Sequence, residues 1–148
     1  MPLGMASRIV PMGDTHLGWV VPAASALVLG SAWALRRIGR AQRVAERIST
    51  AYPWANPSVA GKIVEVAKEV KADPYALANL IEFESGGNPR AVNPVTGATG
   101  LIQFLPLTAA RLGTSTAALA GLPITEQLDW VEQYLQAVGK GKSLRAPH

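Results

Sequence analysis

Glu84 is the residue of this sequence whose position best suits acid–base chemistry. The pair Asp73-Pro74 combines a helix-capping side chain with a helix-starting proline, and two glycines follow Ser85, so we predict a helix over Pro74–Ser85. Glu84 follows Leu77 by seven residues and continues the apolar stripe that would face a core. Burial there would disfavour the charged carboxylate and raise its pKa, as a general acid working near neutral pH requires. The alternative is that the helix frays before Glu84 and leaves its side chain in water.

A long connection follows this helix. Residues 84–106 read ESGGNPRAVNPVTGATGLIQFLP, which is rich in glycine and proline and, beyond Glu84, carries only the charge of Arg90. Connections of this length without secondary structure are uncommon in compact domains and are often functional. We therefore interpret this one as a wall facing a substrate.

Two further helices are expected to position these residues. Asn56-Pro57 is a second start signal, and apolar residues recur at helical spacing over Pro57–Val70. On the last helix the apolar stripe consists of Ile124, Leu128, Val131, Leu135 and Val138. The acids of that helix, Glu126, Asp129 and Glu132, fall off the stripe. We therefore expect them in water, and not beside Glu84 as a second catalytic carboxylate.

Composition excludes several other chemistries. The 148 residues include no cysteine, which rules out a disulfide framework, a thiol nucleophile and a cysteine-ligated metal. The two histidines, His16 and His148, lie at opposite ends, so we expect no metal site and no cofactor. The net charge of +4 comes from basic residues in 36–54 and in the tail from Gly139, whereas the part between them is net negative. A nucleic-acid-binding domain would carry the positive charge itself, so no specific nucleic-acid partner is expected.

The segment from Leu17 to Leu35, LGWVVPAASALVLGSAWAL, contains no charged residue. As a helix it would span roughly 28 Å, close to the ~30 Å hydrocarbon core of a bilayer. Trp19 and Trp33 lie near its ends, and Arg36 follows at once, as is typical of membrane interfaces. We therefore predict a single-pass membrane protein, in preference to a cleaved signal peptide or a buried core helix.

The expected domain order follows from these features. It comprises a short N-terminal segment (1–16), a transmembrane helix (17–35), a basic juxtamembrane helix or linker (36–54), a helical domain (55–138) and a basic flexible tail (139–148). The basic helix could lie along anionic lipid head groups or be a solvated connector. A lipid bilayer is therefore one expected partner.

Four motifs, in order, resemble the soluble lytic transglycosylase (SLT) family, a branch of the lysozyme-like fold. They are Glu84-Ser85, Asn88-Pro89-Arg90-Ala91, the stretch GATGLIQ at 97–103, and Leu112-Gly113. The stretch from Gly100 to Leu135 is most similar to copies carried by bacteriophage virion proteins. The resemblance covers roughly residues 57–138. It implies an all-α fold, in which a small lysozyme-like SLT domain is preceded here by the single transmembrane helix.

The resemblance also implies roles for individual residues. Glu84 matches the single catalytic acid of the family. The residues implied to bind or orient the substrate are Ser85, Gly100, Ile102, Gln103 and Tyr134. Structural roles stay open for three of these. The Ser85 hydroxyl could bond the helix backbone, Gln103 could hold the loop in place, and Tyr134 could pack in the core.

The implied reaction is cleavage of the MurNAc–GlcNAc β-1,4 bond of peptidoglycan, whereas ordinary glycosidases use two carboxylates. In the implied mechanism Glu84 protonates the leaving oxygen, and the N-acetyl group of the substrate stabilises the developing oxocarbenium ion. The ionised Glu84 then deprotonates the 6-hydroxyl of the sugar, which closes a 1,6-anhydro ring. No metal or cofactor takes part.

Two difficulties shape the functional expectation. Fuller family members continue past the last helix with a further helical segment, whereas a basic tail follows here, so either the domain is a minimal version or a neighbouring chain completes it. The positive-inside rule would also place the domain in the cytoplasm, away from its substrate. We therefore expect a virion protein that acts in the periplasm or envelope of a host during genome delivery, beside other virion or membrane-complex proteins. The alternative is a non-catalytic structural component with a degenerate lysozyme-like domain.

Overall fold

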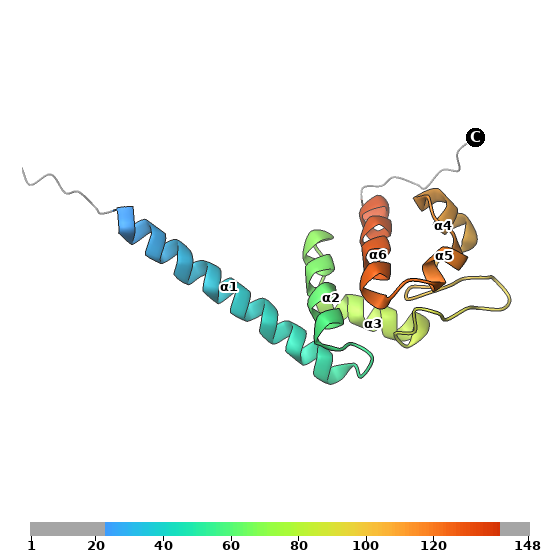
Figure 1. The fold of residues 1–148 in the computed structure, drawn as a ribbon, viewed down its shortest axis with the longest axis horizontal. Helices are drawn as coiled ribbons and strands as arrows, with labels where there is room; N and C mark the ends of the chain where they lie inside the picture. Colours follow the sequence, from blue (N-terminus) through green and yellow to red (C-terminus); the bar gives the residue numbers. More distant parts are fainter. Residues whose placement is uncertain (1–22, 140–148) are drawn as a thin grey trace, which may run out of the picture. The chain divides into compact units, whose positions relative to one another are not determined.

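The structure is a computed structural model that describes residues 23–139 (Figure 1). The six helices of this part are α1 (Ala23–Ala51), α2 (Pro57–Glu69), α3 (Pro74–Ser85), α4 (Pro106–Leu112), α5 (Thr116–Ala120) and α6 (Ile124–Gly139). The only extended pairings among the described residues are isolated bridges of Thr99 with Val92 and with Phe104. The expectation that the regular elements are helices therefore holds for this part of the chain.

The starts of α2 and α3 follow from local capping chemistry. The Asn56 side chain accepts a hydrogen bond from the Val59 N–H at 3.0 Å, and Pro57 occupies the first turn of α2. Asp73 Oδ1 accepts from the N–H groups of Tyr75 and Ala76 at 2.8 and 3.0 Å. These bonds satisfy amides that have no partner inside the helix. Both helices therefore begin where the proline signals predict.

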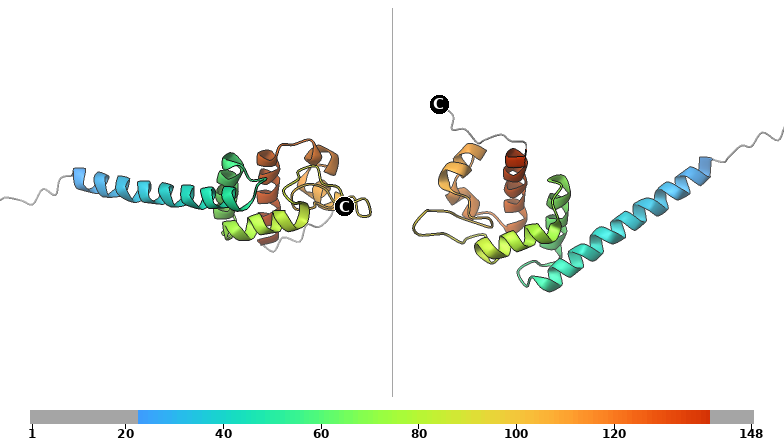
Figure 2. Two further views of the ribbon diagram at one scale, coloured as in Figure 1. Left: turned by 90° about the horizontal axis from the view of Figure 1, so that it is seen from below. Right: turned by 180° about the vertical axis from the view of Figure 1, so that it is seen from behind.

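The core forms around α2, which packs against α3 and α6. The α2 and α6 helices lie side by side, and α3 crosses near one end of the pair (Figure 2). The large aliphatic side chains that are fully buried come from α1, α2, α3, α5, α6 and the loop before α4. The largest of them are Ile48, Ile63, Ile81, Leu101, Leu119, Leu128, Val66 and Val131. The compact unit that contains this core begins at Leu35 in the last part of α1.

The prediction of a transmembrane helix over residues 17–35 is corrected by the structure. None of the helices in the described part is both long and apolar enough to cross a bilayer. The apolar part of α1 ends at Leu35, and the helix continues without a break into Arg36 and Arg37. A span needs about 20 residues, so one that started at Ala23 would extend past Arg40. Residues 17–22 of the predicted segment lie outside the described residues.

Candidate active site

The last turn of α3 carries Glu84 and Ser85 and lies against the long connection to α4. The Ser85 hydroxyl lies 2.9 Å from the carbonyl oxygen of Leu101 and 3.2 Å from that of Ile81. It therefore joins its own helix to the Leu101 turn. The Glu84 side chain is half-buried, and it makes no hydrogen bond or ion pair with another described residue. Its carboxyl group is thus positioned by the helix alone and has its hydrogen-bonding capacity available.

The connection between α3 and α4 is folded tightly by its own backbone. Asn93 starts a turn, because its Oδ1 accepts from the N–H groups of Val95 and Thr96 at 2.9 and 3.2 Å. The Asn93 N–H donates to the Ala98 carbonyl at 2.8 Å, and the Gly100 N–H donates to the Ala91 carbonyl at 2.9 Å. These bonds make residues 91–100 a short hairpin-like arm. The predicted wall is therefore an ordered structure.

Gln127 is the residue that joins this loop to the helical core, and the sequence analysis missed it. It lies on α6 and is fully buried. Its Oε1 accepts from the Leu101 N–H at 3.0 Å, and its Nε2 donates to the carbonyls of Pro89 and Leu119 at 2.6 and 2.7 Å. A buried amide with partners for both ends is a strong structural tie. Its spacing in the sequence could have indicated that it is buried, since Gln127 lies between Ile124 and Val131 on the apolar stripe.

The close approach of Gln127 to the loop requires glycine at position 100. Its φ is +83°, and a Cβ placed on it would lie 2.5 Å from Gln127 Oε1. Only glycine adopts such a conformation without strain and also leaves room for the amide. The structure thus brings Gly100, a residue predicted to bind substrate, against a core side chain.

The other predicted binding residues make contacts inside the protein. Gln103 has a φ of +51°, and its Nε2 donates to the carbonyls of Gly100 and Ala91 at 3.1 and 3.3 Å. Ile102 is half-buried against the core. The Tyr134 ring meets the Phe104 ring edge-on, with centroids 6.0 Å apart. The loop-holding contacts of Gln103 and the packing of Tyr134 are therefore observed, and contact of these residues with a glycan stays a prediction.

Tyr52 and Trp54, which precede α2, also contact α3. The Trp54 indole N–H donates to Glu82 Oε2, and a Cβ on Gly87 would lie 2.1 Å from the Trp54 ring. Nearer the start of α3, the Tyr52 hydroxyl donates to Asn79 Oδ1 at 2.6 Å. Trp54 therefore packs on the glycine that follows α3, one turn from Glu84.

The acids of α6 have separate surroundings. Lys62 on α2 forms an ion pair with Asp129 at 2.8 Å, and Gln136 donates to Glu132 at 2.8 Å. Hydrogen bonds to Asp129 and then Glu65 raise the pKa of Lys62 above its usual value. Glu126 is exposed in the first turn of α6. Asp129 thus serves an ion pair that ties α6 to α2.

Comparisons with known proteins agree with the motifs in this site. Residues 62–129 match the family described as Transglycosylase SLT domain, a segment that contains Glu84, Gly100 and Gln127. A protein of Enterobacteria phage PRD1 named "Transglycosylase" is 47% identical over 45 residues, which make up 30% of this chain and 17% of that protein. No solved structure matches the chain. The resemblance to the SLT family, and to a phage protein, is therefore confirmed.

Proposed function

We propose that this chain is a peptidoglycan lytic transglycosylase that uses Glu84 as its only acid and base. The observation that carries the proposal is the position of Glu84 on the last turn of α3, next to Ser85, whose hydroxyl bonds the Leu101 turn. The segment that matches the SLT family contains this whole arrangement. A half-buried carboxyl group without a protein partner is free to exchange a proton with a substrate.

In the proposed reaction the protonated Glu84 donates its proton to the glycosidic oxygen between MurNAc and GlcNAc, and the C–O bond breaks. The carbonyl oxygen of the substrate N-acetyl group stabilises the positive charge that develops on the sugar ring. The carboxylate of Glu84 then accepts the proton of the 6-hydroxyl, whose oxygen bonds to the anomeric carbon. The products are a 1,6-anhydro end and a free 4-hydroxyl, and Glu84 is protonated again.

In this mechanism the protein holds the carboxyl group of Glu84 at a fixed position relative to the loop between α3 and α4. Gln127 fixes the turn at Leu101, and Ser85 ties that turn to the helix that carries Glu84. Preorganisation of this kind lowers the cost of reaching the transition state. Glycan contacts by Gly100, Ile102, Gln103 and Tyr134 belong to the same proposal.

The biological setting is part of the proposal. The similarity to a transglycosylase of a phage supports a virion-associated protein that opens the host cell wall during genome delivery. Its partners would be peptidoglycan glycan strands and other proteins of the particle.

The test compares Glu84→Gln with Glu126→Gln, because Glu126 is an exposed acid of the same family-matched segment. We expect Glu84→Gln to reduce the release of soluble fragments from purified peptidoglycan by about 100-fold or more, since an acid–base group contributes roughly 10²–10⁴ in rate. Glu126→Gln should retain full activity. Mass spectrometry of the fragments should find 1,6-anhydro ends. Reducing ends instead, or an active Glu84→Gln, would contradict the mechanism.

One observation favours a second, non-catalytic function. The Ser85 hydroxyl and the Gln103 side-chain amide both donate hydrogen bonds to backbone carbonyls of this chain. Both side chains are therefore less available to bind a glycan. A structural virion component would bind sedimented peptidoglycan without releasing fragments, and Glu84→Gln would bind it equally well. These two results together would indicate a non-catalytic glycan-binding protein instead of an enzyme.

A further inference from the structure

A cavity of about 340 Å³ lies between the last part of α1 and the start of α3, away from Glu84. The residues that line it are Arg40, Arg43, Val44, Arg47 and Tyr75. The three arginines follow one another at spacings of three and four, so they share one face of α1. Tyr75 lies on the first turn of α3, whereas Glu84 lies on its last turn. The cavity and the candidate active site are therefore separated by about 13 Å along the helix axis.

The arginines that line this cavity, Arg40, Arg43 and Arg47, have no ion-pair partner in the described part of the chain. Asp73, the N-cap of α3, lies two residues before Tyr75, and its Oδ1 accepts from the N–H groups of Tyr75 and Ala76. No acidic side chain lines the cavity.

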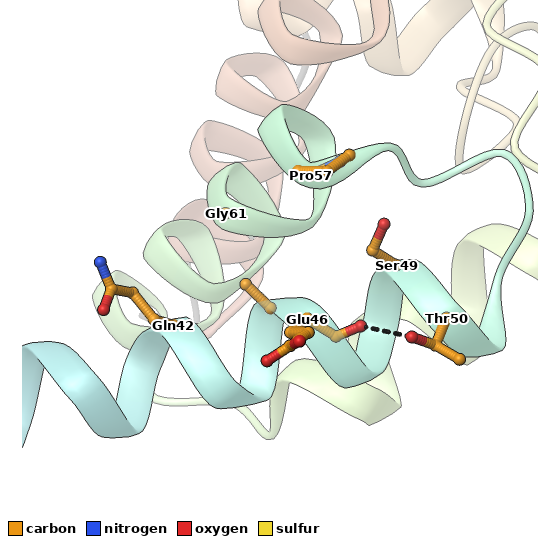
Figure 3. A pocket seen from close by; sticks show the side chains of 7 residues that line it. Gln42, Glu46, Ser49, Thr50, Pro57 and Gly61 are labelled. Carbon is orange, nitrogen blue, oxygen red and sulfur yellow. Dashed lines mark hydrogen bonds between the residues drawn. The ribbon is translucent and has the colours of Figure 1, made fainter.

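Glu46, the only acidic residue of α1, follows Arg43 by three residues and so lies beside it on the helix surface, but it forms no ion pair with another described residue. It lines a separate pocket together with Gln42, Ser49 and Gly61, between α1 and α2 (Figure 3). Glu46 thus lines one pocket, whereas Arg40, Arg43 and Arg47 line the other. Like charges at helical spacing repel one another, so an anion in the arginine-lined cavity would relieve a cost that the free protein bears.

We propose that this cavity binds a phosphate group. Guanidinium groups bind phosphate through paired N–H···O bonds, and several of them around one cavity match the two or more charges of a phosphate or pyrophosphate. The half-buried Tyr75 adds a hydroxyl, and the half-buried Val44 adds an apolar surface. The group can belong to a soluble phosphate compound or to the head group of an anionic lipid. The site is independent of the proposed glycan chemistry.

The test measures binding to the full-length chain, with inorganic pyrophosphate in isothermal titration calorimetry as the soluble probe. Arg43→Lys keeps the charge and removes the paired hydrogen bonds, and Arg43→Gln removes both. Arg36→Gln is the matched control, because Arg36 is an exposed arginine of the same helix that does not line the cavity. Circular dichroism of each variant checks that the helices are intact.

We expect Arg43→Gln to weaken pyrophosphate binding about tenfold or more, since hydrogen bonds between charged groups are worth at least that much. Arg43→Lys should weaken it several-fold, and Arg36→Gln should stay within about twofold of the unmodified chain. A second arm measures sedimentation with phosphatidylglycerol vesicles against phosphatidylcholine vesicles. Arg43-dependent binding to anionic vesicles without pyrophosphate binding would identify the lipid head group as the source.

Three results would overturn the proposal. The first is the absence of binding to both pyrophosphate and anionic vesicles. The second is an equal loss of binding in Arg36→Gln and Arg43→Gln, which would indicate general electrostatic attraction. The third is undiminished binding by Arg43→Lys. That result would show that the site requires only a positive charge and not the paired hydrogen bonds of a guanidinium group.

Discussion

The tie between Gly100 and Gln127 can be tested by one added methyl group. Gly100→Ala and Gly113→Ala form a matched pair, because both glycines have a left-handed backbone, with φ of +83° and +87°. A Cβ at Gly113 meets nothing within 4 Å, whereas a Cβ at Gly100 would lie 2.5 Å from Gln127 Oε1. Each alanine costs about 1–2 kcal/mol through its backbone conformation alone. The difference between the two variants therefore measures the contact with Gln127.

The size of that difference follows from the bonds of Gln127. Although Oε1 is the end of a flexible side chain, the residue is fully buried and its amide bonds three backbone groups. It cannot turn away without leaving the Leu101 N–H unpaired, which costs about 1–3 kcal/mol. We expect Gly100→Ala to lower the free energy of unfolding by about 2–5 kcal/mol, and Gly113→Ala by about 1–2 kcal/mol.

Urea unfolding followed by circular dichroism measures both variants. The double variant Gly100→Ala with Gln127→Ala removes the obstructing amide, so its loss of stability should be smaller than the sum of the two single losses. Equal destabilisation by Gly100→Ala and Gly113→Ala, together with additive effects in the double variant, would refute the inference that Gln127 holds the loop.

Two further predictions concern the ties around the same core. Gly87→Ala should destabilise the protein by at least about 1 kcal/mol more than Gly86→Ala, because both have positive φ but only Gly87 lies against the Trp54 ring; equal unfolding energies in urea would contradict this contact. Lys62→Met should lower stability at about pH 8 by up to about 1 kcal/mol. The raised pKa of Lys62 means that its contribution is complete below the usual value of 10.5 and is lost as pH rises through the folded-state value. The difference from the unmodified chain, measured by urea unfolding at increasing pH, should therefore shrink above pH 10.5, and a constant difference would argue against the Lys62–Asp129 pair.

The parts of the fold that the sequence predicted well depend on local chemistry. Asn56 and Asp73 cap their helices through bonds to amides two or three residues away, so their sequence neighbours are sufficient to locate the starts of α2 and α3. The glycine-rich loop was recognisable for the same reason, because positive φ at Gly97 and Gly100 is a property of single residues.

The parts that could not be predicted depend on contacts between distant segments. Gln127 bonds Pro89 across 38 positions of the sequence, and no local pattern specifies that pairing. The hydroxyl of Ser85 reaches Leu101 in the same way. The transmembrane prediction failed for a different reason. It took residues 17–35 as one apolar helix, whereas the described helix α1 begins at Ala23 and reaches Arg36 well before the roughly 20 residues that a span needs.

The contacts of residues that precede the family-matched segment bear directly on the candidate site. The match begins at residue 62, yet Ile48 is fully buried in the core and Trp54 covers Gly87 beside the last turn of α3. The segment that matches the SLT family therefore does not contain all of the packing around the last turn of α3. The last turn of α3 is held by two long-range hydrogen bonds, one from Trp54 to Glu82 and one from Ser85 to Leu101. The helix therefore extends past Glu84 to Ser85, and the catalytic role of Glu84 stays a prediction.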